Sequence, residues 1–296
     1  MLLDRLRALV ADPPPVLAVE ISEVGLAAAR IGSRTEMEFV PLKPGTLAIS
    51  PAQDNVIDGD DFAQAVFAVG RAQAGRKRRD VAVILPDYCT RTAVLDFDSF
   101  PSDAKEQLSL IKFRLRRSVP FDIEAAAISY WAQPVAHKKV DVAVVVSPLE
   151  VVARYEAPFR AAGMNPGLLT TSSLAALELA PESGLSVMAK IAGRVLSVVV
   201  RDKASLKLVR CVELASSDWE DVAAVLAPTF VYMEDNLGGR AGKLQLCGFG
   251  AQTDEMERRF ASELAVEVET VRSPLGAPGE NNAGLLGYLR SIARNN

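Results

Sequence analysis

The sequence predicts an α/β protein of two lobes with a duplicated core and a smaller βαββ subdomain inserted in the first lobe. Two observations support this fold class. The segment VLAVEISEVGLAAARI at 16–31 returns as VMAKIAGRVLSVVVRD at 187–202, and two apolar runs around a short polar turn are typical of a β-hairpin. Residues 86–147 have the pattern strand, helix, strand, strand. We therefore expect the first lobe at 1–183, including the insert, and the second at 184–296.

The composition is typical of a globular protein. The chain has 296 residues and is 49% hydrophobic, which is enough apolar material for the cores of two domains. Its 33 basic and 37 acidic residues give a net charge of −4, which does not favour a nucleic-acid partner. No apolar run is long enough to span a membrane, and charges interrupt the N-terminal segment, so we expect a cytoplasmic protein. Core thiols in a reducing compartment are expected at Cys89, Cys211 and Cys247.

The N-terminal part of the first lobe contains the first hairpin and one further helix. Residues 1–11 carry an apolar stripe that favours a short helix docked on the protein, and the prolines at 13–15 end it. The stretch after the hairpin is rich in proline and is predicted as a loop. A helix is expected over about 60–73, and the basic cluster at 75–80 would be its solvated end. The apolar residues that this helix is expected to bury are Phe62, Val66, Phe67 and Val69.

The insert is expected to form a small sheet with one helix on it. Strands are predicted at 81–86, before it, and at 90–98, 125–134 and 140–148. The helix at 102–119 is amphipathic, and Pro120 stops it. Its apolar stripe consists of Ala104, Leu108, Ile111, Leu115 and Val119. Its other side is basic, with Lys112, Arg114, Arg116 and Arg117.

The rest of the chain alternates helices and strands. Helices are predicted at 148–163, with a kink at Pro158 and an end at Gly163, and at 171–181. In the second lobe a strand at 206–214 follows the repeated hairpin, and a helix begins at an N-cap, Ser217, and ends at Gly238 and Gly239. The last elements are a strand at 243–250, a helix at 251–264, a strand at 266–271 and a helix at 283–294. Trp131 and Trp219 are expected to pack in the interior.

The two hairpins are candidate phosphate-binding elements, because turns that face one another between two lobes can hold a nucleotide. The first turn is predicted at 20–23 and the second at 190–193. Gly248 and Gly250 stand between a strand and a helix, where the polar groups of a nucleotide or an adenine could lie. The single histidine, His137, is expected in an exposed turn, so no catalytic triad and no multi-histidine metal site can be assembled. We predict no catalytic residue and no metal site.

Taken together, these segments resemble the PilM family of type IV pilus assembly proteins, which belongs to the actin-like, ribonuclease H-like superfamily with FtsA and the sugar kinases. The resemblance is collinear over nearly the whole chain. It is most specific at 84–130, where a strand ending in Leu-Pro, an Arg-Thr strand, a Pro-led helix and a Val-Pro-Phe turn follow one another. Residues 144–180 are similar to the strand, helix, Ala-Gly turn and helix of the family. The sequence CGFGA at 247–251 is similar to its adenosine-side motif.

The resemblance implies a cytoplasmic scaffold at the face of the inner membrane. In the PilM family the N-terminal tail of a bitopic inner-membrane partner, PilN, lies in a groove between the first lobe and the insert, which is a favourable site for an extended peptide. The partner-binding candidates are Arg114, Arg117, Pro120 and Phe121, and the alternative is a solvated basic face with a buried aromatic turn. The membrane would be contacted only through the partner, and self-association of actin-like lobes is a further expectation.

The chain departs from the superfamily at both phosphate hairpins, which usually read Asp, hydrophobic, Gly. Here the triplets are Glu20-Ile21-Ser22 and Lys190-Ile191-Ala192. Glycine lets backbone amides approach phosphates and a carboxylate orients magnesium, so these changes predict a degenerate site in which ATP binds weakly or not at all, and no other cofactor. The residual nucleotide site would consist of Glu20, Ser22, Lys190, Gly193, Gly248 and Gly250.

Two alternative functions stay open at the level of sequence. The first is an actin-like ATPase or kinase that uses Glu20 and the glycine turn, although no acidic residue stands in a motif that identifies a general base. The second is the equivalent cytoplasmic component of a type II secretion system.

Overall fold

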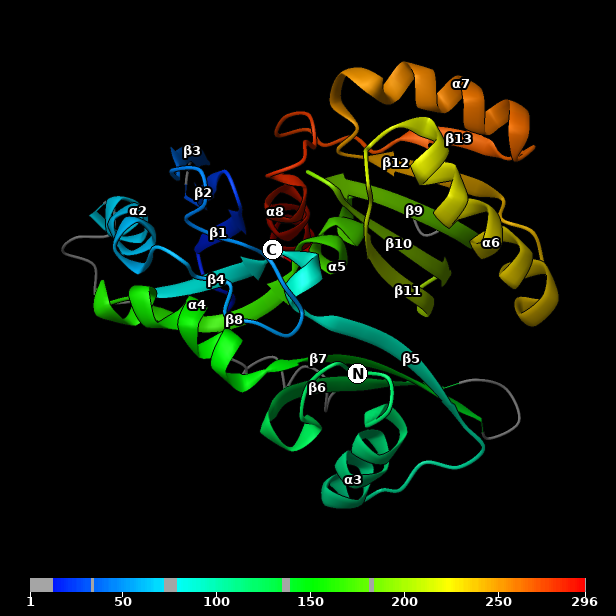
Figure 1. The fold of residues 1–296 in the computed structure, drawn as a ribbon, viewed down its shortest axis with the longest axis horizontal. Helices are drawn as coiled ribbons and strands as arrows, with labels where there is room; N and C mark the ends of the chain where they lie inside the picture. Colours follow the sequence, from blue (N-terminus) through cyan, green and yellow to red (C-terminus); the bar gives the residue numbers. More distant parts are fainter. Residues whose placement is uncertain (1–12, 33–34, 72–78, 135–138, 181–183, 296) are drawn as a thin grey trace.

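Two five-stranded sheets with the same topology form the two lobes of the computed structural model (Figure 1). The structure describes residues 13–32, 35–71, 79–134, 139–180 and 184–295. The first sheet has the order β3-β2-β1-β4-β8, with β1 (Leu17–Ser22), β2 (Gly25–Arg30), β3 (Glu36–Pro41), β4 (Asp80–Leu85) and β8 (Asn165–Thr171). The second has the order β11-β10-β9-β12-β13, with β9 (Leu185–Ala192), β10 (Val195–Asp202), β11 (Ser205–Glu213), β12 (Lys243–Cys247) and β13 (Glu267–Thr270).

The strand directions repeat as well, which confirms the predicted duplication of the core. In each sheet the first three strands are antiparallel neighbours, and two parallel strands follow on the other side of the first strand. Both hairpins close with a two-residue turn, between Ser22 and Gly25 and between Ala192 and Val195. Glu20 and Lys190 therefore lie within strands, and the prediction that they form the turns is wrong. The strands continue beyond Glu20 and Lys190, because the residues that follow still pair with the opposite strand until the two-residue turn begins.

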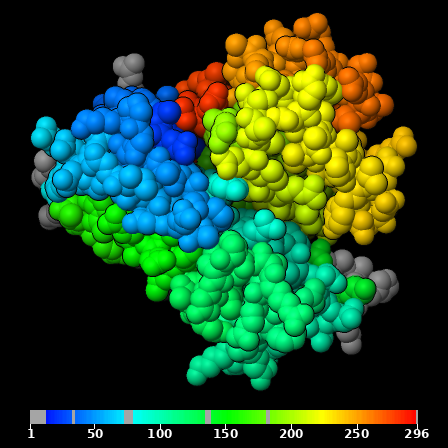
Figure 2. Space-filling model, viewed as in Figure 1, coloured from blue at the N-terminus to red at the C-terminus, as the bar shows by residue number. Residues whose placement is uncertain are grey.

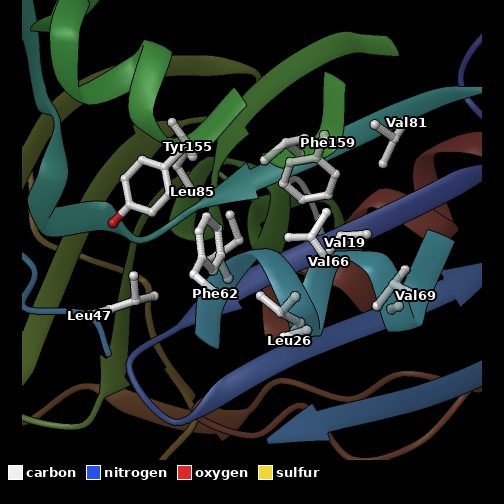
Figure 3. Close-up of a cluster of buried hydrophobic side chains, with 14 of the residues drawn as sticks. Val19, Leu26, Leu47, Phe62, Val66, Val69, Val81, Leu85, Tyr155 and Phe159 are labelled. Carbon is white, nitrogen blue, oxygen red and sulfur yellow. The ribbon is translucent and has the colours of Figure 1, made fainter. Parts of the chain in front are cut away.

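The outer face of each sheet is covered by two helices. In the first lobe α2 (Gly59–Arg71) and α4 (Leu149–Ala161) pack on β1, β2 and β4. Figure 3 shows Phe62 and Val66 of α2 meeting Tyr155 and Phe159 of α4 over the strand residues. The Phe62 and Tyr155 rings lie edge to face, with centroids 6.0 Å apart. In the second lobe α6 (Trp219–Leu237) and α7 (Thr253–Glu263) cover the corresponding face.

Two inner helices, α5 (Ser172–Ala176) and α8 (Ala283–Asn295), lie between the lobes (Figure 1). Their apolar residues form one buried cluster with inward-facing residues of both sheets, such as Ala18, Ile84 and Met188. The two helices approach so closely that a Cβ added at Gly287 would lie 2.0 Å from the carbonyl oxygen of Ala175. Both inner helices begin at the side of the molecule where the two hairpins meet, which places their N-terminal amides beside Glu20 and Asp87.

The insert is a three-stranded sheet in the order β5-β7-β6, and it confirms the predicted βαββ pattern. Its strands are β5 (Arg91–Phe97), β6 (Ala126–Pro134) and β7 (Val140–Pro148). The helix α3 (Ala104–Leu115) begins at Asp103, whose carboxylate accepts hydrogen bonds from two backbone amides, and packs on one face through Ile111 and Leu115. The insert forms the green lower part of the space-filling view (Figure 2).

The other face of the insert sheet contacts the second lobe. The side chain of Gln133 in β6 donates to the carbonyl of Leu206 at 3.1 Å and accepts from its amide at 2.7 Å, so it pairs with β11 as a strand residue would. Lys207 and Asp141 form an ion pair at 2.8 Å beside it. The insert is therefore joined to both lobes.

Some predicted elements differ from the structure. Strand β3 forms where a loop was predicted, and strand β8 forms where no element was predicted. Both are edge strands, and sheet edges tolerate irregular, proline-containing sequence. Phe67 is exposed, since it lies on the outer side of α2. The helix α6 begins after Asp218, one residue beyond the predicted cap. The predictions for residues 1–11, 75–78 and 137 lie outside the described residues.

Further differences concern burial. On α3, Ala104 is exposed and Leu108 is only half-buried, so the predicted stripe narrows to Ile111 and Leu115. Trp131 is 40% exposed, whereas Trp219 packs on Phe260 with ring centroids 4.5 Å apart. Of the three free cysteines, Cys89 and Cys247 are buried and Cys211 is half-buried.

Candidate functional site

The predicted phosphate-side carboxylate, Glu20, is buried where β1 ends and is fully engaged inside the protein. Its side chain is 2% exposed. One carboxylate oxygen accepts a hydrogen bond from the Ser172 hydroxyl, and the other accepts from the Leu285 amide at 2.7 Å, in the first turn of α8. The carboxylate thus caps an inner helix, where the helix dipole favours negative charge. Each oxygen of the carboxylate therefore accepts one hydrogen bond from an inner helix.

Lys190 occupies the equivalent inward position in β9 and forms a buried ion pair. Its ammonium nitrogen lies 3.2 Å from the Asp87 carboxylate, and the two side chains are 1% and 5% exposed. Asp87 also accepts hydrogen bonds from the Ser197 hydroxyl at 2.8 Å and from the Ser173 amide at 2.7 Å, at the start of α5. We call these contacts, with those of Glu20, the interlobe polar network. Asp87 thus links the second lobe to α5, and Glu20 links β1 of the first lobe to α8.

The protonation equilibria agree with this arrangement. Burial raises the pKa of Glu20, against the opposing effects of Lys190 and the hydrogen bonds from Ser172 and Leu285. Burial disfavours the charged form of Lys190 as well, but the carboxylates of Asp87 and Glu20 outweigh it and raise the pKa of the ammonium above its ordinary value. Lys190 is therefore a cation held by protein carboxylates.

The interlobe cleft that remains above this network is small and acidic. It has a volume of about 250 Å³. Its lining includes five carboxylates, Glu20, Glu23, Asp87, Glu213 and Glu280, and two cations, Lys190 and Arg194. Both cations form ion pairs, Lys190 with Asp87 and Arg194 with Glu213. A triphosphate would enter a field of the same sign as its own charge.

One amide of the second turn and one carboxylate of the first turn are also engaged within the protein. The Gly193 amide, which could otherwise face a phosphate, donates to Glu280 at 3.2 Å. Glu23 in the first turn accepts from the Ile49 amide at 3.2 Å. Gly248 has φ +85°, and a Cβ there would lie 2.4 Å from the carbonyl oxygen of Ile191, so close packing on β9 explains this glycine. Gly250, with φ +53°, has open space around it.

No group of three or more metal-ligating side chains is found in the described ranges of the chain. The structure brings Glu20, Ser22, Lys190 and Gly193 together around the cleft. Asp87, which sequence reasoning missed, stands at the centre of the polar network. Its position directly after the Leu-Pro end of a central strand could have indicated it, because such positions line the edge where ligands bind in α/β sheets.

A second concave site, which we call the insert groove, lies between the first lobe and the insert. It has a volume of about 270 Å³. It is lined by Leu85, Thr90, Ala127, Ile128, Ser129, Trp131, Val145, Ser147, Val152, Leu169, Thr170, Thr171 and Leu174. An adjoining hollow of about 450 Å³ shares Trp131, Thr170 and Leu174 with it, so the groove continues past the indole ring.

The insert groove has the features of a peptide site. Its flanking strands β6 and β8 are both edge strands, each hydrogen-bonded to one neighbour in the described sheets. The Thr171 hydroxyl is buried and has no hydrogen-bond partner among the described residues. Most of the side chains that line the groove are apolar or small.

Comparison with solved structures decides the fold. No family model and no curated protein matches the sequence. The structure is similar to a PilM–PilN type IV pilus biogenesis complex, with a TM-score of 0.71, 17% identity, and coverage of 95% of this chain and 99% of that one. It is also similar to a Bacteroides thetaiotaomicron protein with an actin-like ATPase fold and unknown function, with a TM-score of 0.55, 12% identity, and coverage of 93% and 95%. The fold is actin-like.

A third similar structure is the cytoplasmic domain of EpsL, an inner-membrane component of the type II secretion system of Vibrio cholerae. The TM-score is 0.51 and the identity 13%, with 94% of each chain covered. These similarities confirm the predicted fold and the resemblance to PilM at the level of structure. In the described residues, no helix is both long and apolar enough to span a bilayer.

None of the four predicted partner-binding residues lines the insert groove of this actin-like fold. α3 packs on the opposite face of the insert sheet, so Arg114 faces outward, where it contacts Asp96 and stacks over Phe97 at 5.2 Å. Arg117 is exposed, and Phe121 packs against the core of the insert. Pro120 lines a polar hollow next to the groove. A role of these residues in partner binding stays a prediction.

Proposed function

We propose that the protein is a cytoplasmic scaffold of a type IV pilus assembly machinery that binds the N-terminal tail of a PilN-like inner-membrane protein in the insert groove. The observation that carries the proposal is the groove itself, together with the similarity of the whole chain to a PilM–PilN complex. The protein would reach the inner membrane through this partner.

The physical properties of the groove favour an extended, mainly apolar segment. The free edges of β6 and β8 offer backbone hydrogen bonds, which is the usual way in which a protein recognises an extended peptide. The unpartnered Thr171 hydroxyl could bond a backbone amide or carbonyl of the occupant, which would remove the cost of leaving it unsatisfied. Trp131, which is 40% exposed in the middle of the groove, offers a large apolar contact.

We further propose that the interlobe cleft has lost nucleotide binding and that the protein is a scaffold and not an ATPase. The support is that other groups of the protein already bind the Glu20 carboxylate, the Lys190 ammonium and the Gly193 amide, which a nucleotide and its magnesium ion would otherwise contact. A calorimetric titration with ATP and magnesium should give no binding heat at micromolar protein concentration. Low-micromolar affinity with phosphate release would instead support the ATPase alternative.

The decisive experiment is a titration of the protein with a synthetic peptide. The peptide should copy the N-terminal cytoplasmic tail of a PilN-like inner-membrane protein from the same genome, and a scrambled peptide of the same composition is the control. Saturable binding of the native tail alone is expected. Absence of binding by a folded protein would overturn the proposal.

The similarity to the cytoplasmic domain of EpsL supports a second candidate, a component of a type II secretion system. The two candidates differ in the partner. The same titration with the cytoplasmic segment of a neighbouring secretion protein would distinguish them.

A further inference from the structure

The chain enters the first sheet beside β8. The carbonyl oxygen of Pro15 accepts a hydrogen bond at 2.8 Å from the Tyr288 hydroxyl of α8. The ring of Pro15 also lies next to Gly167, because a Cβ added at this glycine would be 3.7 Å from the ring. Gly167 belongs to β8, the edge strand of the first sheet on the side of the insert (Figure 1). The residues that precede Pro13 are therefore attached to the fold at this edge.

An apolar path leads along β8 from Pro15 to the insert groove. Leu168 and Thr170 lie on the inner face of the sheet, because they pair with residues of β4 that belong to the inner apolar cluster. Leu168 is 38% exposed, and Thr170 lines both the insert groove and the hollow that adjoins it. From Gly167 to Thr170 the strand runs about 10 Å at 3.3 Å per residue. The hollow beyond is mainly apolar, with Trp131, Leu174, Leu177, Ala180, Ala204 and Leu206 in its lining.

The sequence of residues 1–12 suits such a surface. It carries an apolar stripe at helical spacing, and its charged residues lie off the stripe. The stripe consists of Leu2, Leu3, Leu6, Leu9 and Val10. Twelve residues span about 18 Å as a helix and about 40 Å when extended, so either form is longer than the path from Gly167 to the hollow. An amphipathic segment that lays its apolar side in an apolar groove is a common mode of recognition.

We propose that residues 1–12 dock in the adjoining hollow and the neighbouring end of the insert groove of their own chain, where they cover Trp131. The short connection through Pro15 selects this occupant over a second copy, because a tethered segment has an effective concentration in the millimolar range. The docked segment competes with any other peptide for the groove and lowers its apparent affinity. This regulatory consequence rests on the proposed function, whereas the docking itself does not.

Acrylamide quenching of Trp131 fluorescence tests the docking without any partner. All proteins carry Trp219→Phe, so that Trp131 is the only tryptophan. The double variant Leu6→Ser with Leu9→Ser removes two apolar side chains from the stripe. It should raise the quenching constant of Trp131, because the released segment no longer shields the indole ring. An unchanged quenching constant would overturn the proposal.

The matched control is the double variant Asp4→Ser with Arg7→Ser. It has the same spacing, leaves the net charge unchanged and lies off the apolar stripe, so its quenching constant should equal that of the wild type. Quenching of the wild type should not depend on protein concentration, because an intramolecular contact is not diluted. Shielding that disappears on dilution would place the segment in the groove of a second copy and contradict the proposal. Thermal unfolding confirms that each variant is folded.

Titration with the tail peptide of a PilN-like protein tests the regulatory consequence. The variant Leu6→Ser with Leu9→Ser should bind the tail about tenfold more tightly than the wild type, which is the factor expected when the docked form makes up about 90% of the free protein. Equal affinities, with shielding of Trp131 confirmed, would show that the docked segment does not block the tail and would refute the regulation. If neither protein binds the tail, the proposed function fails, and the quenching comparison still decides the docking.

Discussion

Replacing Lys190 with methionine tests the interlobe polar network directly. Methionine keeps much of the aliphatic volume but removes the cation from a site that is 1% exposed. The variant leaves the carboxylates of Asp87 and Glu20 buried without a counter-ion. Their hydrogen bonds to Ser197, Ser173 and Leu285 stay in place, so the change isolates the charge.

The expected loss of stability follows from the geometry. At the observed 3.2 Å, the attraction between Lys190 and Asp87 is about 5 kcal/mol at an effective dielectric constant of about 20. Desolvation of both groups offsets part of this gain in the intact pair, but removal of one partner leaves that cost uncompensated. We therefore expect Lys190→Met to lower the free energy of unfolding by about 3 to 5 kcal/mol. The melting temperature should fall by roughly 6 to 20 °C, at about 2 to 4 °C per kcal/mol.

Urea denaturation of wild type, Lys190→Met, Asp87→Asn and the double variant measures this coupling. The double variant should be more stable than the sum of the single effects predicts, because no uncompensated charge remains at this pair. Lys207→Met is the matched control. Lys207 pairs with Asp141 at 2.8 Å, but both side chains are about a fifth exposed, so a loss of about 1 kcal/mol or less is expected. Equal losses for the two lysines, or strictly additive effects at Lys190 and Asp87, would refute the reasoning.

Three further outcomes are expected. Trp131→Ala should weaken binding of the partner tail at least tenfold in the calorimetric titration, while Val231→Ala on the far lobe should not change it. Burial raises the pKa of Glu20, so the folded state holds that proton more tightly than the unfolded state does. The stability of the wild-type protein should therefore fall as the pH rises from 4.5 through the raised pKa. Urea denaturation of Glu20→Gln at the same pH values should not show this decrease. The pKa of Asp61 is lowered to about 2 by hydrogen bonds from the Lys43 amide and the Thr46 hydroxyl and by the Lys43 ammonium. Its stabilising effect is complete above pH 3.8 and is lost as pH falls toward 2, so thermal unfolding of Asp61→Asn and wild type should differ at neutral pH and converge in acid.

The sequence was most informative where a local pattern determines the structure. The apolar runs at 16–31 and 187–202 predicted both hairpins, and comparison of the two copies placed Glu20 and Lys190 at equivalent positions. The insert was predicted because its helix and strands differ clearly in periodicity. Edge strands β3 and β8 were missed, since half-exposed strands that contain proline lack a regular alternation.

The candidate site was less predictable, because it depends on contacts between distant segments. Lys190 meets Asp87 across 103 positions of sequence, and Glu20 meets Leu285 across 265. No local signal shows that a lysine in a phosphate hairpin has an internal carboxylate as its partner. The insert groove was predicted as a feature, but its lining was not, because Trp131 was expected to be packed inside.

The pairing of Gln133 with the backbone of Leu206 limits how the molecule can move. A rotation of the second lobe against the insert is one such motion. Here such a rotation would have to pull an amide side chain off a strand and expose two buried backbone groups, and the Lys207–Asp141 contact would break with them. These contacts therefore hold the insert and the second lobe in one relative arrangement.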